Sequence, residues 1–172
     1  MLTENKIALA NRHRNRTAWH ESGHALTAVL WFGGVVKYAT IKPEAGQSLR
    51  GFSGIQAGHV EYLDTVKVNL NTIGGWAAIY MAGRAAEILG GVEDPESDRS
   101  EENDKDQVRD DAVRIGLGLD PAHGERLILK GRSAATALLA RKRKALEAIA
   151  NKLLARETLT GNEILAIVHG DL

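Results

Sequence analysis

The stretch TAWHESGHALTAVLWF, residues 17–32, decides how the rest of the chain is interpreted. It carries His20 and His24 four residues apart, with Glu21 beside the first histidine. On an α-helix, residues at i and i+4 share a face, so both imidazoles can reach one ion at roughly 2.0–2.1 Å. The neighbouring residues are small or apolar, which predicts a mostly buried helix that ends at Gly33-Gly34. Histidines and a carboxylate inside such a helix need partners.

The pattern HExxH is typical of zinc hydrolases, in which the histidines bind the metal and the glutamate is the general base. We therefore interpret His20 and His24 as Zn²⁺ ligands. Glu21 would take a proton from the attacking water and pass it to the leaving amine. The alternative is a surface cluster of two histidines and a glutamate that only form local hydrogen bonds.

Composition narrows the class of protein. The chain has 172 residues, of which 44% are hydrophobic and 26% charged, as in an ordinary globular domain. Lys plus Arg and Asp plus Glu both number 22, so net charge gives no reason to expect nucleic acid or a membrane as partner. There is no cysteine, so a metal must be bound by His, Asp or Glu. No apolar run reaches the roughly 18–20 residues of a membrane span, no signal peptide is recognisable, and we expect a cytoplasmic protein.

Hydrophobic periodicity predicts mostly helices with a few short strands. The fold that we expect is mainly α (α+β), with a small β-sheet beside the HExxH helix. We expect one domain over residues 1–172, with an N-terminal basic segment (1–16), a zinc-site region (17–118) and C-terminal helices (119–172). Strands are predicted at 35–42 and, rich in glycine, at 51–58. Helices are predicted at 60–90 (in two pieces broken near Gly74-Gly75), from near Ser100 to about Gly116, at 132–156, and at 161–169 after a Thr160/Glu163 capping box.

A catalytic zinc usually has three protein ligands, and the third is not obvious from spacing. In HExxHxxGxxH enzymes it would lie six residues beyond His24, but that position is Leu30. Glu87 on a later helix is one candidate. An aspartate near the start of the predicted 100–116 helix is another, and spacing alone leaves both open.

Five segments in the same order resemble the peptidase domain of the FtsH-type ATP-dependent zinc proteases: TAWHESGHAL, YATIKP, MAGRAAEILGG, SEENDKDQVRDDAVRIG and RKALEAIANKLLARETLTGNEI. The resemblance covers roughly residues 5 to 169. It implies that the Asp of the END segment, Asp104, is the third zinc ligand, with His20 and His24 as the others and Glu21 as base. Glu87 in GRAAE would then support the site through Arg84 or by a hydrogen bond to a ligand histidine.

The same resemblance implies a function. It implies a zinc-dependent metalloendopeptidase that hydrolyses unfolded or small protein substrates. In the family the substrate pairs with an edge strand beside the zinc, and GFSGIQA, residues 51–57, is the segment in that place, although it departs from the usual family sequence. His59, just beyond it, is a candidate for substrate contact, though a lone histidine is more often a surface residue.

Partners follow from the same comparison. The sequence contains no GxxxxGK[ST] phosphate loop, so we expect a peptidase domain without its own ATPase, which a separate ATPase could supply with substrate. Rings are typical of the family's peptidase domains, so a homo-oligomer is compatible with the resemblance. The basic stretches 11–16 and 141–144 are interpreted as solvated surface rather than nucleic-acid contacts. The alternative function is a non-catalytic zinc-binding interaction or assembly module derived from such a peptidase.

Overall fold

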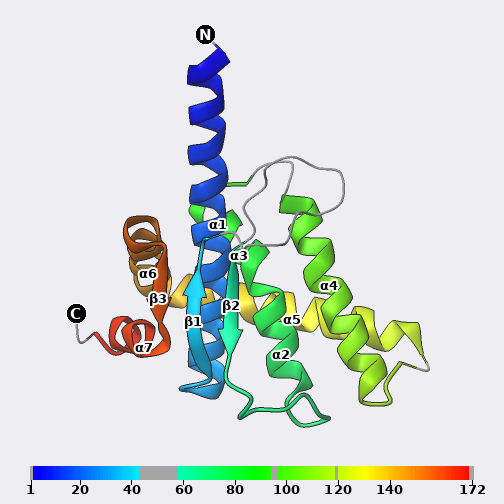
Figure 1. Ribbon diagram of the computed structural model, residues 1–172. Helices are drawn as coiled ribbons and strands as arrows, with labels where there is room; N and C mark the ends of the chain where they lie inside the picture. The colour runs from blue at the N-terminus through cyan, green and yellow to red at the C-terminus, as the bar shows by residue number, and fades with distance from the viewer. Residues whose placement is uncertain (1, 43–57, 94–96, 119, 171–172) are drawn as a thin grey trace.

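Helix α1 (Leu2–Phe32) is the axis around which the other elements are arranged (Figure 1). The computed structural model describes residues 2–42, 58–93, 97–118 and 120–170. After α1 the described elements are β1 (Val36–Thr40), β2 (His59–Tyr62), α2 (Ile73–Tyr80), α3 (Ala82–Gly90), α4 (Ser97–Arg114), α5 (Pro121–Arg141), α6 (Arg143–Arg156), β3 (Thr158–Thr160) and α7 (Gly161–His169). The prediction of a mainly helical fold with a small sheet is confirmed.

The HExxH segment lies in the buried half of α1. Between Arg16 and Val29 every residue is buried except His20, which is partly exposed. Helices α3 and α6 pack against α1, while α2 packs on α5. The prediction of a mostly buried HExxH helix is therefore confirmed, but the helix starts much earlier than residue 17, and the basic segment 11–16 forms part of it.

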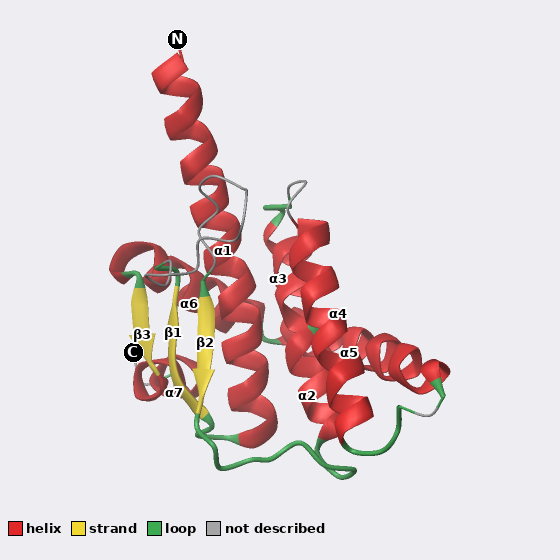
Figure 2. Cartoon of the chain, turned by 45° about the vertical axis from the view of Figure 1, so that its right-hand side comes forward, coloured by secondary structure: helices red, strands yellow, loops and turns green. Residues whose placement is uncertain are grey.

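The sheet is antiparallel, with the strand order β2-β1-β3, so among the described residues β2 is an edge strand (Figure 2). Thr40 at the end of β1 is aligned with His59 on one side and with Thr158 on the other. Strand β3 was not predicted. Its three residues pair with β1 and lead directly into α7, whose N-terminus has the predicted capping box of Thr160 and Glu163.

The prediction of a helix over residues 60–90 is wrong in its first third. Residues 59–62 form β2, because their backbone pairs with β1. The chain then turns, and the Asn69 side chain accepts hydrogen bonds from the backbone N–H groups of Asn71 and Thr72, which favours a turn over a helix. Helix α2 starts only at Ile73, and the break between the two helical pieces is at Met81 rather than at Gly74-Gly75.

Other boundaries differ as well. The predicted helix over 132–156 consists of α5 and α6, which meet at Lys142, and α5 begins at residue 121 after an N-cap formed by Asp120. The predicted strand 51–58 lies outside the described residues except for Gly58, which is not part of a strand. None of the described helices combines the length and the apolar character that crossing a membrane requires.

Candidate metal centre

Three side chains from two helices converge on one point. His20 and His24 project from α1, and Asp104 projects from α4. Nε2 of His20 lies 3.6 Å from Oδ2 of Asp104, and Nε2 of His24 lies 3.7 Å from Oδ1. The two Nε2 atoms are 2.9 Å apart. One ligand atom from each residue lies within 4.8 Å of the others, which is the arrangement expected of a three-ligand metal site.

The other ring nitrogens are engaged on the far side. Nδ1 of His20 lies 2.7 Å from Oε1 of Glu87, and Nδ1 of His24 lies 2.7 Å from the backbone carbonyl oxygen of Ile79. A carboxylate and a carbonyl can only accept, so each Nδ1–H donates. In the neutral form of each ring Nε2 is then the unprotonated nitrogen, on the side of Asp104, which is how histidine ligands are prepared for a metal. In His20, whose pKa is raised to about 9, a metal must first displace the proton that Nε2 carries near neutral pH.

Glu87 lies behind His20. Its side chain is fully buried, and besides His20 it contacts Nη1 of Arg84 at 3.4 Å and Nη1 of Arg16 at 3.9 Å. This is the supporting position that was one of the two alternatives for Glu87. The geometry favours Asp104 over Glu87 as the third metal-facing group, since Glu87 binds the nitrogen that points away from the cluster.

The surroundings of the Asp104 carboxylate indicate whether a metal ion would fit among these three side chains. Its Oδ2 atom is buried and has no hydrogen-bond partner among the described residues. A buried carboxylate oxygen without a partner is unfavourable, and a cation between it and the two Nε2 atoms would remove that penalty. The donor set of two imidazoles and one carboxylate is one that zinc commonly takes. The residues present therefore fit a zinc ion.

The electrostatics of the cluster reflect its burial. Burial raises the pKa of Asp104 to about 7 and that of Glu21 to about 7. Burial lowers the pKa of His24 to about 3. Burial also lowers the pKa of His20, but the hydrogen bond to Glu87 and the charge of Asp104 outweigh it and raise that pKa to about 9. A divalent cation would favour ionised carboxylates and neutral histidines, so it would oppose several of these shifts.

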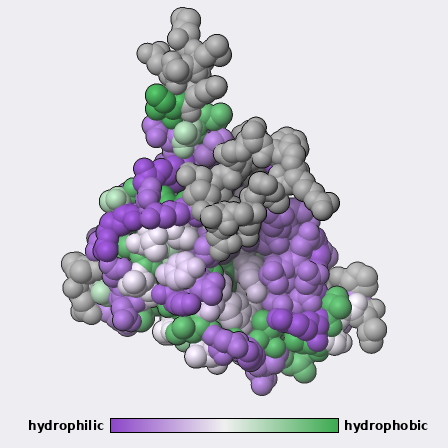
Figure 3. All heavy atoms as spheres, viewed as in Figure 1, coloured by the Kyte–Doolittle hydropathy of each residue, from purple (hydrophilic) through white to green (hydrophobic). Residues whose placement is uncertain are grey.

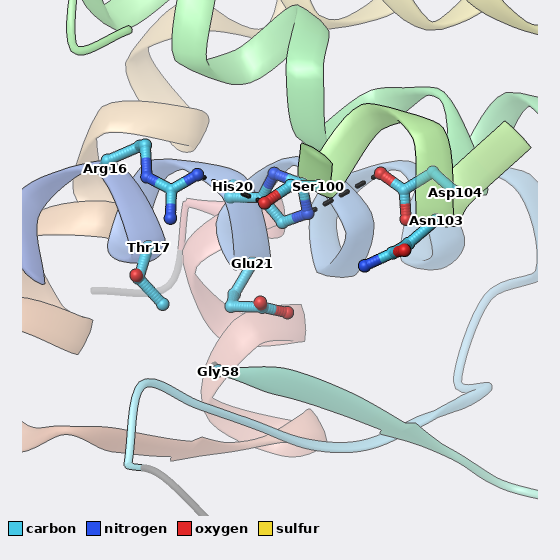
Figure 4. A pocket seen from close by; sticks show the side chains of 8 residues that line it. All are labelled: Arg16, Thr17, His20, Glu21, Gly58, Ser100, Asn103 and Asp104. Carbon is cyan, nitrogen blue, oxygen red and sulfur yellow. Dashed lines mark hydrogen bonds and ion pairs between the residues drawn. The ribbon is translucent and has the colours of Figure 1, made fainter. Parts of the chain in front are cut away.

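Glu21 lines the same pocket as His20, His24 and Asp104. Its residue is 5% exposed, and its carboxylate has no hydrogen-bond partner among the residues that the structure describes. Figure 4 shows Glu21 directed away from α1 toward Gly58, beside the pocket that Arg16, Ser100 and Asp104 also line. A carboxylate placed next to the metal-facing atoms and not bonded elsewhere can accept a proton there.

Three glycines allow the close packing that fixes these side chains. A Cβ atom at Gly83 would lie 2.4 Å from Cε1 of His20, so α3 approaches the histidine ring directly. A Cβ at Gly23 would lie 2.4 Å from the carbonyl oxygen of Ala82. A Cβ at Gly58 would lie 2.8 Å from Cγ of Glu21. Gly83, the second residue of α3, is thus explained by close packing against His20.

A cleft runs past the cluster. It consists of two adjoining cavities of about 150 and 350 Å³ that share His20, Glu21, Gly58, Asn103 and Asp104. In the larger cavity, β2 contributes His59, Val60 and Tyr62, and α4 contributes Asn103, Asp104 and Gln107. His59, a predicted candidate for substrate contact, lies on this wall and contacts Tyr38.

Sequence reasoning missed Asn103 and Gln107. Their one recognisable signal is their spacing, i and i+4 on the helix that carries Asp104. The other aspartates around Asp104 have different contacts: Asp98 lies near Arg84, Asp106 pairs with Arg109, and Asp111 accepts from Tyr80.

No protein-family model matches this chain, and no curated protein matches it either.

Proposed function

We propose that this chain is a zinc-dependent metalloendopeptidase that resembles the peptidase domain of the FtsH-type proteases. One observation carries the proposal: Nε2 of His20, Nε2 of His24 and the Asp104 carboxylate converge, with Glu21 in the same cleft. A surface cluster of histidines does not account for this geometry, because His24, Glu21 and Glu87 are buried. A purely structural metal site does not account for a glutamate whose carboxylate faces the cleft.

His20, His24 and Asp104 would hold the zinc ion. When bound, zinc would polarise the scissile carbonyl and activate a water. Glu21 accepts the proton of the attacking water and returns it to the leaving amine. Burial raises the pKa of Glu21 to about 7 in the metal-free protein, and a zinc ion beside it would lower this pKa, so Glu21 would be ionised and able to accept a proton near neutral pH. Glu87 and the carbonyl of Ile79 keep the two imidazole rings in the orientation that this work needs.

The position of β2 supports a polypeptide as the substrate. In the part of the chain that the structure describes, β2 is at the edge of the sheet and lines the cleft, and an extended chain added to it would pair by main-chain hydrogen bonds. Such pairing is tolerant of sequence, but it requires the substrate to be extended. Unfolded or short polypeptides are therefore the substrate class, and a separate ATPase is a suitable partner for folded ones.

The test is cleavage of an unfolded protein. Casein is the probe, since it needs no unfolding and so removes any requirement for a partner ATPase. We expect zinc-loaded wild type to cleave casein and Glu21→Gln to bind zinc equally well without cleaving. Glu147→Gln, on an exposed part of α6, is the matched control and should cleave like wild type. Cleavage that persists in Glu21→Gln would refute the role of Glu21. Zinc binding without any cleavage by wild type would support the alternative, a non-catalytic binding module.

A further inference from the structure

The cleft is lined by α4 as well as by β2, and the proposed function assigns no substrate contact to α4. We propose that Asn103 and Gln107 on α4 bind the main chain of an extended substrate along the edge that faces away from β2. The inference rests on the proposed peptidase function, because it states how the same cleft would hold a polypeptide. It identifies the substrate as a chain recognised through its peptide groups on both edges.

The two amides are placed for such a contact. Asn103 and Gln107 are exposed, and both line the larger cavity together with His59, Val60 and Tyr62. Neither side chain forms a hydrogen bond to another residue in the part of the chain that the structure describes. Figure 4 shows the Asn103 side chain projecting from α4 into the pocket, on the side where Glu21 lies.

Other side chains of α4 differ from these two amides in their contacts. Several of its charged side chains are engaged in ion pairs: Glu101 and Glu102 with Lys105, and Asp106 with Arg109. Figure 3 shows a largely hydrophilic surface over α4. Within it, the side chains of α4 that line the larger cavity are Asn103, Asp104 and Gln107. Two neutral amides therefore flank the aspartate that faces the metal site.

The spacing of the two amides matches that of an extended chain. Four helical residues rise about 6 Å along the axis. In a strand, peptide groups on one edge recur every two residues, at about 6.6–6.8 Å. Figures 1 and 2 both show α4 and β2 running in the same general direction. Successive peptide groups of a chain paired with β2 would therefore meet Asn103 and Gln107 in turn.

The chemistry of the amide group fits this task. A peptide chain that pairs with β2 through one edge leaves the N–H and C=O groups of its other edge to be satisfied. A primary amide offers both a donor and an acceptor, so it can bond a peptide N–H and a peptide C=O at once. A carboxylate or an ammonium group at these positions could match only one of the two. Recognition by amides also adds no preference for charged substrate side chains.

The first experiment measures binding rather than cleavage. A short fluorescein-labelled casein peptide is titrated with the zinc-loaded Glu21→Gln protein, and fluorescence anisotropy gives the dissociation constant. Adding Asn103→Ala or Gln107→Ala should weaken binding about five- to tenfold, as expected for the loss of one or two hydrogen bonds. Asn151→Ala, an exposed asparagine on α6, is the matched control and should bind like the parent. Zinc content should be the same in all four proteins.

The second experiment uses peptides in which one backbone N–H at a time is replaced by N-methyl. At a position whose N–H faces α4, methylation should weaken binding to the parent and add little in the Asn103→Ala or Gln107→Ala protein. This non-additivity is the signature of a direct contact. Equal affinity of parent and both variants, or additive effects at every position, would overturn the inference. Because binding is read without turnover, a failure of wild type to cleave casein would count against the peptidase function alone.

Discussion

Nδ1 of His20 donates a hydrogen bond to Oε1 of the fully buried Glu87 over a distance of 2.7 Å. This contact joins the HExxH helix to α3 and sets the direction of the other ring nitrogen. Arg84 and Arg16 lie near the same carboxylate, and these two positive charges explain why a buried glutamate is stable at this position.

Glu87→Gln should lower zinc affinity by about 10- to 100-fold, because the carboxylate that orients His20 and raises its basicity is lost. The measurement is competition for zinc against a chelator of known affinity. Glu147→Gln serves again as the control for a Glu-to-Gln change on an exposed helix. Unchanged zinc affinity in Glu87→Gln would show that the hydrogen bond does not prepare His20 as a ligand.

Gly83→Ala should displace the ring of His20, since the added methyl group would lie 2.4 Å from Cε1. We expect weaker zinc binding and a loss of about 1–3 kcal/mol in the free energy of unfolding, as for other overpacked sites. Denaturant unfolding and zinc content are the two measurements. Gly74→Ala in α2 is the control: a Cβ there meets nothing within 4 Å, so stability should be unchanged or slightly higher. Wild-type behaviour of Gly83→Ala would contradict the close packing of α3 on His20.

Gly58→Ala should impair the proposed general base, Glu21, without affecting zinc binding. The added Cβ would lie 2.8 Å from Cγ of Glu21 and 2.6 Å from the carbonyl oxygen of Thr40, but it is not part of the metal-facing group. We predict at least a tenfold fall in kcat/KM on casein-derived peptides, because a small misplacement of a catalytic group has a large effect. Zinc content should remain that of wild type. A parallel loss of zinc and activity would mean that Gly58 supports the whole site rather than Glu21.

Zinc affinity should fall as the pH is lowered. Burial raises the pKa of Asp104 to about 7, so below that pH the metal-free carboxyl carries a proton that zinc must displace. His20, whose pKa is raised to about 9, must also lose a proton to bind zinc, so affinity should fall about tenfold per pH unit from about 9 to 7 and about a hundredfold per unit below about 7. Chelator competition across this range, with calorimetry in two buffers to count released protons, measures it. Affinity independent of pH would exclude a protonated Asp104 in the metal-free protein.

Local patterns predicted the half of the site that lies on one helix. His20, Glu21 and His24 depend only on helical geometry, so their spacing was sufficient. Asp104 lies on α4, and no spacing rule reaches that far along the chain. It was predicted from the family resemblance alone, and the structure places it beside both histidines.

The errors have a common physical cause. Strand β2 and strand β3 exist because they pair with β1, and such non-local pairing leaves a weak trace in short segments. For this reason the helix predicted over residues 60–90 wrongly included most of β2 and the turn after it. Asn103 and Gln107 were missed for a related reason: within an acidic, polar helix they look like ordinary solvated residues until β2 is placed opposite them.

The metal content of purified wild type, His20→Ala and Asp104→Ala is the decisive measurement of whether these residues hold a zinc ion. Asp106→Ala is the control, because Asp106 is exposed on the same helix and pairs with Arg109 instead of facing the cluster. We predict about one zinc per chain in wild type and in Asp106→Ala, and little or none in the other two. Full zinc content in Asp104→Ala, or none in wild type after supplementation, would contradict this prediction.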